Sequence, residues 1–186
     1  KALIISIKGT KLSKKEKLLF TKEKPWGVIL FKRNLKSLDQ IKNLVSNIKN
    51  LTKNKHFPVL IDEEGSSVTR LRNIINNDIS ANFFGNLYKE NKTFALRILR
   101  HYIDSLSNIL INLGININTI PVLDVLRKNT SKVIGNRSFS KNKNIVRELG
   151  KFTIDQLNKN KIGSVAKHIP GHGSATIDSH KKMPKI

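Results

Sequence analysis

The stretch PVLIDEEG (residues 58–65) is a short, continuous apolar run that ends at once in three carboxylates. Three other short apolar runs also end in charged or polar residues, which are Lys32-Arg33-Asn34, Asp124, and Lys167-His168. Unbroken apolar runs are typical of parallel strands that helices cover on both faces. Because α/β proteins build their sites at the carboxyl ends of parallel strands, four polar strand ends in succession predict one shared site.

Helical patterns separate the apolar runs. Strands are expected at 2–7, 26–31, 58–61, within 115–125, and at 162–166; helices are expected at 13–20, 37–51, 93–114 and 143–160. Ser37 is a suitable N-cap, Ser13 and Glu16 have capping-box spacing, and Gly114 is placed to end the third helix. The Asn-rich region around 73–86 is expected to be a loop or a short irregular segment. Strand–helix alternation without a linker or a repeat predicts one α/β domain over residues 1–186.

The composition excludes several classes of protein. The 186 residues contain no cysteine, which excludes a disulfide framework and thiol chemistry and suits the reducing cytoplasm, where we expect the protein to be located. No apolar run is long enough to span a membrane, and the first residues make a poor signal peptide, so no membrane partner is expected. The net charge of +22 comes from lysines spread over every segment. This dispersion favours nonspecific attraction to polyanions over a specific nucleic-acid partner, although a basic nucleic-acid-binding domain is an alternative.

The segment KHIPGHGSATIDSH (167–180) contains three of the five histidines. In an extended loop Asp178 and His180 project to the same side, so the carboxylate can hold one ring nitrogen and orient the other toward a substrate. His168, His172 and His180 could in principle ligate zinc. Their spacing around Pro170 and Gly171 is not that of a helical metal site, so no metal is expected. The GHGS sequence also lacks the spacing and the Lys-Ser/Thr of a phosphate-binding loop.

The same segment resembles the signature loop of glycoside hydrolase family 3, in particular the bacterial β-N-acetylglucosaminidases of cell-wall recycling. Four further blocks resemble segments of that family in the same order: GVILFKRN (27–34), IDEEGSSVTRLR (61–72), PVLDV (121–125) and IGNRSF (134–139). The resemblance implies a (β/α)8 TIM barrel and retaining hydrolysis without a cofactor. Since a full barrel has eight strands in about 250 residues, the five expected strands correspond to roughly the first five β/α units.

The resemblance also implies roles for individual residues. His180 corresponds to the acid/base of the family and Asp178 to its orienting partner, while Asp62 corresponds to the residue that grips sugar hydroxyls. The remaining sugar-contacting positions of the family fall on Arg70, Arg137, Lys167 and His168. The two arginines could instead be ordinary surface salt-bridge residues. The substrate implied is a peptidoglycan-derived sugar with a terminal β-linked N-acetylglucosamine.

The sequence departs from the family at several points. Glu63 stands where the family has Gln, and Gly65-Ser66-Ser67 stands where it has Gly-Gly-Arg, so the first binding loop is expected to be less open or differently charged. No aspartate of this chain matches the nucleophile of the family, which lies on a later strand, and Asp124 is interpreted as structural support for the mouth of the barrel. We therefore expect the chain to need the missing C-terminal half of the barrel as its partner and to hydrolyse almost nothing alone. The alternative is an inactive sugar-binding remnant of such an enzyme.

Overall fold

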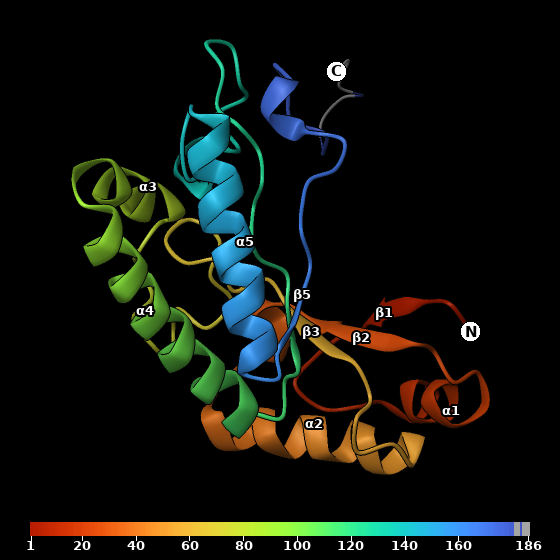
Figure 1. Cartoon of the computed structure of the whole chain (residues 1–186). Coiled ribbons are helices and arrows are strands. Elements are labelled where there is room, and N and C mark those ends of the chain that lie inside the picture. The colour runs from red at the N-terminus through yellow and green to blue at the C-terminus, as the bar shows by residue number, and fades with distance from the viewer. Residues whose placement is uncertain (181–182, 184–186) are drawn as a thin grey trace.

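The computed structural model describes residues 1–180 and residue 183, and its centre is a sheet of five parallel strands. The strands are β1 (Ile4–Ser6), β2 (Gly27–Leu30), β3 (Val59–Ile61), β4 (Ile117–Asn118) and β5 (Gly163–Ser164). Their order in the sheet equals their order in the sequence, with Ile29 opposite Leu60 and Ile117 opposite Gly163. The prediction of an α/β fold comprising five β/α units is confirmed, and β1 and β5 form the two edges of an open sheet (Figure 1).

Helices connect the strands. The α-helices are α1 (Lys14–Lys22), α2 (Leu38–Thr52), α3 (Ala81–Glu90), α4 (Lys92–Asn112) and α5 (Lys143–Lys159), and the short 3-10 helices are η1 (Lys32–Asn34), η2 (Gly135–Arg137) and η3 (His172–Ser174). The helix α2 lies below the sheet in Figure 1, whereas the loops that carry η2 and η3 rise above it. None of the described helices has the length and apolar character that a membrane span requires.

The expected helix caps form. The side chain of Ser37 accepts a hydrogen bond from the backbone N–H of Gln40, and Ser13 and Glu16 form a reciprocal capping box at the start of α1. Gly114 has φ +77°, a left-handed conformation that a residue with a side chain adopts only at a cost. These local signals fix where the helices begin and end, and tertiary packing then selects their buried faces.

The prediction of a loop or short irregular segment around residues 73–86 is partly wrong, because α3 begins at Ala81. Ser80 caps this helix by accepting from the N–H of Phe83. Phe84 is buried and its ring lies 5.2 Å from that of Tyr102 on α4, measured between ring centroids. The helix is held by tertiary contacts that an Asn-rich sequence does not reveal.

Gly85 in α3 lies against the backbone of Phe139. A Cβ atom at this position would be 1.7 Å from the carbonyl oxygen of Phe139. We expect Gly85→Ala to lower the melting temperature by about 2–12 °C, because overpacking costs about 1–3 kcal/mol and each kcal/mol shifts a domain of this size by about 2–4 °C. Gly9→Ala is the matched control, since nothing lies within 4 Å of its added Cβ. Equal melting temperatures for the two variants in a thermal scan would contradict the close approach.

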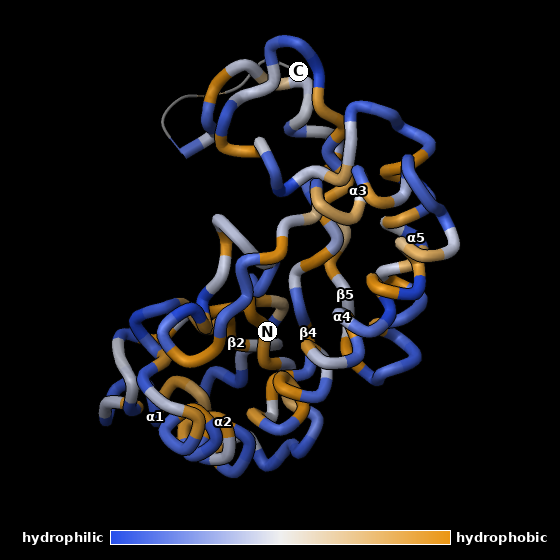
Figure 2. The backbone as a smooth tube through the Cα atoms, turned by 90° about the vertical axis from the view of Figure 1, so that its left-hand side faces the viewer, coloured by the Kyte–Doolittle hydropathy of each residue, from blue (hydrophilic) through white to orange (hydrophobic). Residues whose placement is uncertain are grey.

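One hydrophobic core lies between the strands and the helices. Its members include Val28, Leu30, Val59 and Ile61 from the sheet, together with Ile103 from α4, all with 0 % exposure. In Figure 2 the hydrophobic segments, drawn in orange, gather where strands and helices meet. The loops at the carboxyl ends of the strands stand on this rigid base.

Candidate functional site

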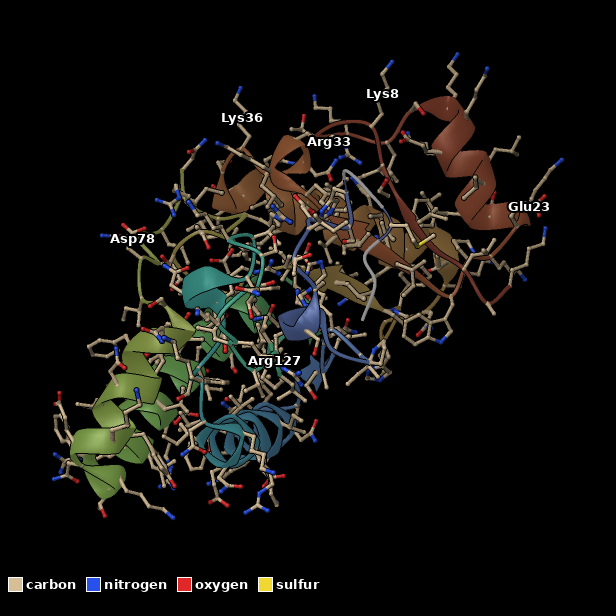
Figure 3. The ribbon with its side chains drawn as sticks, turned by 90° about the horizontal axis from the view of Figure 1, so that it is seen from above. Lys8, Glu23, Arg33, Lys36, Asp78 and Arg127 are labelled. Atoms are coloured by element: carbon tan, nitrogen blue, oxygen red, sulfur yellow. The ribbon has the colours of Figure 1, made fainter. Side chains whose placement is uncertain are left out.

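The polar residues that follow β2 form hydrogen bonds with the end of β1 and the loop after it. The Arg33 guanidinium donates to the carbonyl of Ile7 (3.0 Å) and to the hydroxyl of Ser6 (2.9 Å). The buried amide of Asn34 donates to the carbonyl of Ile7 (3.1 Å) and to that of Gly9 (2.9 Å). In the view from above, Lys8 and Lys36 extend outward from this region (Figure 3). Arg33 and Asn34 thus fix the loop that follows β1. The ends of the other three strands supply the cluster of site residues.

The carboxyl ends of β4 and β5 run side by side beyond the regular strands. The N–H of Val165 donates to the carbonyl of Ile120 (3.2 Å), and the N–H of Lys167 donates to that of Pro121 (3.1 Å). Proline has no N–H, so the pairing cannot continue as a regular ladder. This irregular extension carries Lys167 and His168 to the end of the sheet where Asp62 and Asp124 also lie.

Asp62 occupies the centre of the first group of site residues. Its carboxylate accepts from the Arg70 guanidinium (2.9 Å) and from the Thr119 hydroxyl (2.5 Å), and the Lys167 ammonium lies 3.4 Å away. Burial raises the pKa of this carboxyl, but the hydrogen bonds from Thr119 and Arg70 and the charges of Lys167 and Arg70 outweigh it, so the pKa of Asp62 is about 2. Asp62 is therefore an ionised acceptor at any physiological pH.

Glu64 joins the cations of the site, a role that the sequence did not indicate. Its side chain is 3 % exposed and forms a two-point ion pair with Arg137, at 2.7 Å from Nε to Oε2 and 3.0 Å from Nη2 to Oε1. The Lys167 ammonium lies 2.6 Å from Oε1. Burial lowers the pKa of Arg137, but the bond and the charge of Glu64 raise it overall. Arg137 and Lys167, both predicted site residues, are thus held by one buried carboxylate.

Asp124 supports His168, in agreement with the expected supporting role. The Oδ2 atom of Asp124 lies 2.6 Å from Nδ1 of His168, and Oδ1 accepts from the N–H of Gly173 (2.9 Å). Burial opposes ionisation of Asp124, but the bonds from His168 and Gly173 lower its pKa. The other ring nitrogen of His168 lies 3.4 Å from Nη2 of Arg137. One buried aspartate therefore orients the imidazole and anchors the loop that contains η3.

Asp178 and His180 form the pair that their spacing predicts. Nδ1 of His180 lies 2.7 Å from Oδ1 of Asp178, and the backbone N–H of His180 donates to the same oxygen (2.9 Å). The His180 side chain is 84 % exposed, whereas that of Asp178 is 23 % exposed. The carboxylate occupies Nδ1, so Nε2 is the ring nitrogen that can reach a ligand.

Ser66 and Ser67, which differ from the residues of the family at these positions, connect the first binding loop to η2. Asn136 donates to the hydroxyl of Ser66 (3.0 Å) and accepts from that of Ser67 (3.3 Å). Gly65 has φ +91°, and a Cβ there would be 2.2 Å from the carbonyl oxygen of Ile79. This loop is therefore closed by neutral hydrogen bonds to the segment that carries Arg137.

The chemistry of the cluster suits a ligand with many hydroxyl groups. Three strand ends bring together one ionised carboxylate acceptor, two arginines, a lysine and an oriented imidazole, and such groups hydrogen-bond hydroxyl and amide oxygens. Over residues 1–180 and 183, no three His, Cys, Asp or Glu side chains are grouped so as to hold a metal ion. Sequence reasoning missed Glu64 and Thr119, which act through contacts between distant segments.

Comparisons with known proteins agree with this architecture. The family model described as "Glycosyl hydrolase family 3 N terminal domain" matches residues 3–186. A beta-hexosaminidase of Thioalkalivibrio sulfidiphilus is 32% identical over 182 residues, which cover 98% of this chain and 52% of the relative. A beta-hexosaminidase of Alkalilimnicola ehrlichii is 33% identical over 186 residues, with 98% and 52% covered.

Solved structures show the same fold. NagZ from Neisseria gonorrhoeae, in a complex with N-trifluoroacetyl-D-glucosamine, matches with a TM-score of 0.88 and 31% identity, and the match covers 98% of this chain and 53% of that chain. The chain spans about half the length of the curated relatives and the NagZ structure that it matches. Since the family model matches nearly every residue, this chain belongs to glycosyl hydrolase family 3 and corresponds to its N-terminal domain.

Proposed function

We propose that this chain forms the sugar-binding part of a retaining β-N-acetylhexosaminidase that releases terminal β-linked N-acetylglucosamine from peptidoglycan-derived sugars in the cytoplasm. The observation that carries the proposal is the convergence of Asp62, Arg70, Arg137, Lys167 and His168 at one end of the sheet. Two of these residues also meet on Glu64. The family of the chain, and the N-acyl glucosamine bound by the NagZ structure, support the choice of sugar.

In the proposed reaction His180 acts as the acid and then as the base. Nε2 of His180 donates a proton to the glycosidic oxygen while a carboxylate attacks the anomeric carbon, which yields a covalent glycosyl-enzyme. His180 then takes a proton from water, and the water oxygen displaces the carboxylate from the sugar. Asp178 holds Nδ1 throughout. The attacking carboxylate would come from the part of the relatives that this chain does not match, so residues 1–186 form one segment of a single barrel domain in this proposal.

The direct test is hydrolysis of an aryl N-acetyl-β-glucosaminide by the whole protein, with the matching aryl β-glucoside as the comparison. Turnover of the first with retention at the anomeric carbon, read by NMR, supports the proposal. Sugar binding without turnover would point to the inactive remnant instead. Preferred hydrolysis of the glucoside would contradict the assignment of the N-acetyl sugar.

Asp62→Asn should weaken the binding of N-acetylglucosamine. Each hydrogen bond from a sugar hydroxyl to a charged group contributes about 1.5–3 kcal/mol, so we expect at least a 10-fold loss in affinity. Titration calorimetry checks this result. Asp155→Asn, which removes an exposed ion pair with Lys151 on α5, is the matched control and should leave the affinity unchanged. Equal affinities for the two variants would exclude Asp62 from the sugar site.

A further inference from the structure

Glu63 lies between the site residues Asp62 and Glu64, but its side chain points into the protein. The residue has 0 % exposure, and none of the contacts described above uses its carboxylate. A buried carboxylate is costly unless hydrogen bonds satisfy it. The donors that surround Glu63 therefore indicate what it does.

Four neutral donors converge on the two oxygens of Glu63. Oε2 accepts from the backbone N–H groups of Arg70 (2.8 Å) and Leu71 (3.0 Å). Oε1 accepts from the side-chain amide of Asn77 (2.6 Å) and from the hydroxyl of Thr69. The carboxylate thus ties together the loop of residues 62–77, including the backbone of Arg70 itself.

Glu63 and its loop are in turn bonded to the sheet and to α4. The backbone N–H of Glu63 donates to Oδ1 of Asn118 (3.1 Å), and Nδ2 of Asn118 donates to the carbonyl of Glu63 (2.9 Å). On the other side, the hydroxyl of Tyr102 donates to Oδ1 of Asn77 (2.9 Å). The loop therefore has a rigid attachment at β4 and a second one at α4.

We propose that Glu63 is a positioning residue: its carboxylate fixes the loop that carries Arg70 and thereby sets where the Arg70 guanidinium stands beside Asp62. Among the described residues the guanidinium is restrained by its bond to Asp62 and by its position 5.6 Å from the centre of the Phe31 ring. A long side chain placed by its backbone needs that backbone to be fixed if it is to hold a ligand in one orientation. This role rests on the proposed function, in which Arg70 contacts the sugar.

Two substitutions of Glu63 test the role of its four hydrogen bonds. Glu63→Ala removes the acceptor from all four donors. Glu63→Gln keeps one oxygen for the two backbone N–H groups, and its amide can then donate to Thr69 and to Asn77. For this to happen the Thr69 hydroxyl must accept, the Asn77 amide must turn over, and the Tyr102 hydroxyl must become an acceptor, all of which these groups can do. Glu63→Gln is therefore the conservative variant that should restore the wild-type behaviour.

The first readout is amide hydrogen exchange in the whole protein, which does not depend on activity. We expect the Arg70 and Leu71 amides of Glu63→Ala to exchange at least about 100-fold faster than in the wild type, since local opening exposes them. The amide of Thr119, which donates to the carbonyl of Ile61 on β3 (3.0 Å), should keep its protection and shows that the sheet remains intact. Should Glu63→Ala fail to fold, Asn77→Ala removes one of the four donors, together with the contact to Tyr102, and should give a smaller change in the same direction.

The second readout is the kinetics with an aryl N-acetyl-β-glucosaminide. Loss of a group that binds substrate and transition state equally raises KM and leaves kcat unchanged, so we expect KM to rise by about 10-fold in Glu63→Ala with kcat within about 3-fold. Glu63→Gln should return KM to within about 3-fold of the wild type. A merely structural role would lower the amount of folded protein without changing KM.

The outcomes separate this inference from the proposed function. Unchanged exchange at Arg70 and Leu71 in Glu63→Ala overturns the inference, and so does faster exchange with an unchanged KM. Failure of the wild type to hydrolyse the substrate counts against the proposed function. In that case the exchange rates, together with N-acetylglucosamine affinity measured by calorimetry, still decide whether Glu63 fixes the loop and positions Arg70.

Discussion

A Glu64→Ala variant of the whole protein should melt about 6–20 °C below the wild type. The substitution leaves the cations of Arg137 and Lys167 without their shared carboxylate, at side-chain exposures of only 11 % and 15 %. Removal of one partner of a buried ion pair costs about 3–5 kcal/mol, and each kcal/mol lowers the melting temperature of a domain of this size by about 2–4 °C. Differential scanning calorimetry measures the shift.

Glu148→Ala is the matched control for this experiment. Glu148 also pairs with two cations, Arg147 at 3.2 Å and Lys92 at 3.8 Å, but on the surface, where its side chain is 44 % exposed. Exposed pairs contribute at most about 1 kcal/mol, so the control should melt within about 4 °C of the wild type. If both variants lose the same stability, Glu64 has no special part in holding the site together.

His180→Ala in the whole protein should lower kcat by about 100-fold to 10,000-fold on a substrate whose leaving group needs a proton. The reason is that the variant keeps the sugar-binding cluster but removes the imidazole that Asp178 orients at 2.7 Å. Steady-state kinetics on a disaccharide with a terminal N-acetylglucosamine measures the loss.

The leaving group distinguishes an acid from a binding residue. A nitrophenol departs without protonation, so the loss on a nitrophenyl glycoside should be much smaller than on the disaccharide when its glycosylation step is measured in a single turnover. His56→Ala, which changes an exposed histidine in the loop before β3, should leave both rates unchanged. An equal loss on the two substrates would contradict the acid role of His180.

The architecture could be predicted from the sequence because its signals are local. Apolar runs identified all five strands, and capping residues such as Ser37 fixed the start of α2. The observed strands are shorter than the expected runs, since only residues with a hydrogen-bonded neighbour form the ladder and Pro121 interrupts it after β4. The helix α3 was missed because its contacts involve distant segments: Phe84 packs against Tyr102, and Gly85 lies against the backbone of Phe139.

The site was predictable only in part, for the same reason. The contact between Asp178 and His180 follows from their spacing, and polar strand ends indicated Asp62, Lys167 and His168. The residue types alone do not show that Glu64 holds two cations whereas its neighbour Glu63 holds a loop. Adjacent side chains on an extended segment point to opposite sides, and only the packed structure shows which of the two faces the site.

The order of the strands in the sheet also affects the order in which the chain can fold during synthesis. Because each strand joins the sheet next to the one made before it, the chain can assemble in the order in which it leaves the ribosome. Glu64 is made 73 residues before Arg137, a delay of about 4–15 s at 5–20 residues per second. Asp62 precedes Lys167 by 105 residues. Asp62 and Glu64 are thus made well before Arg137 and Lys167, and Lys167, which pairs with both carboxylates, emerges only after the fifth strand.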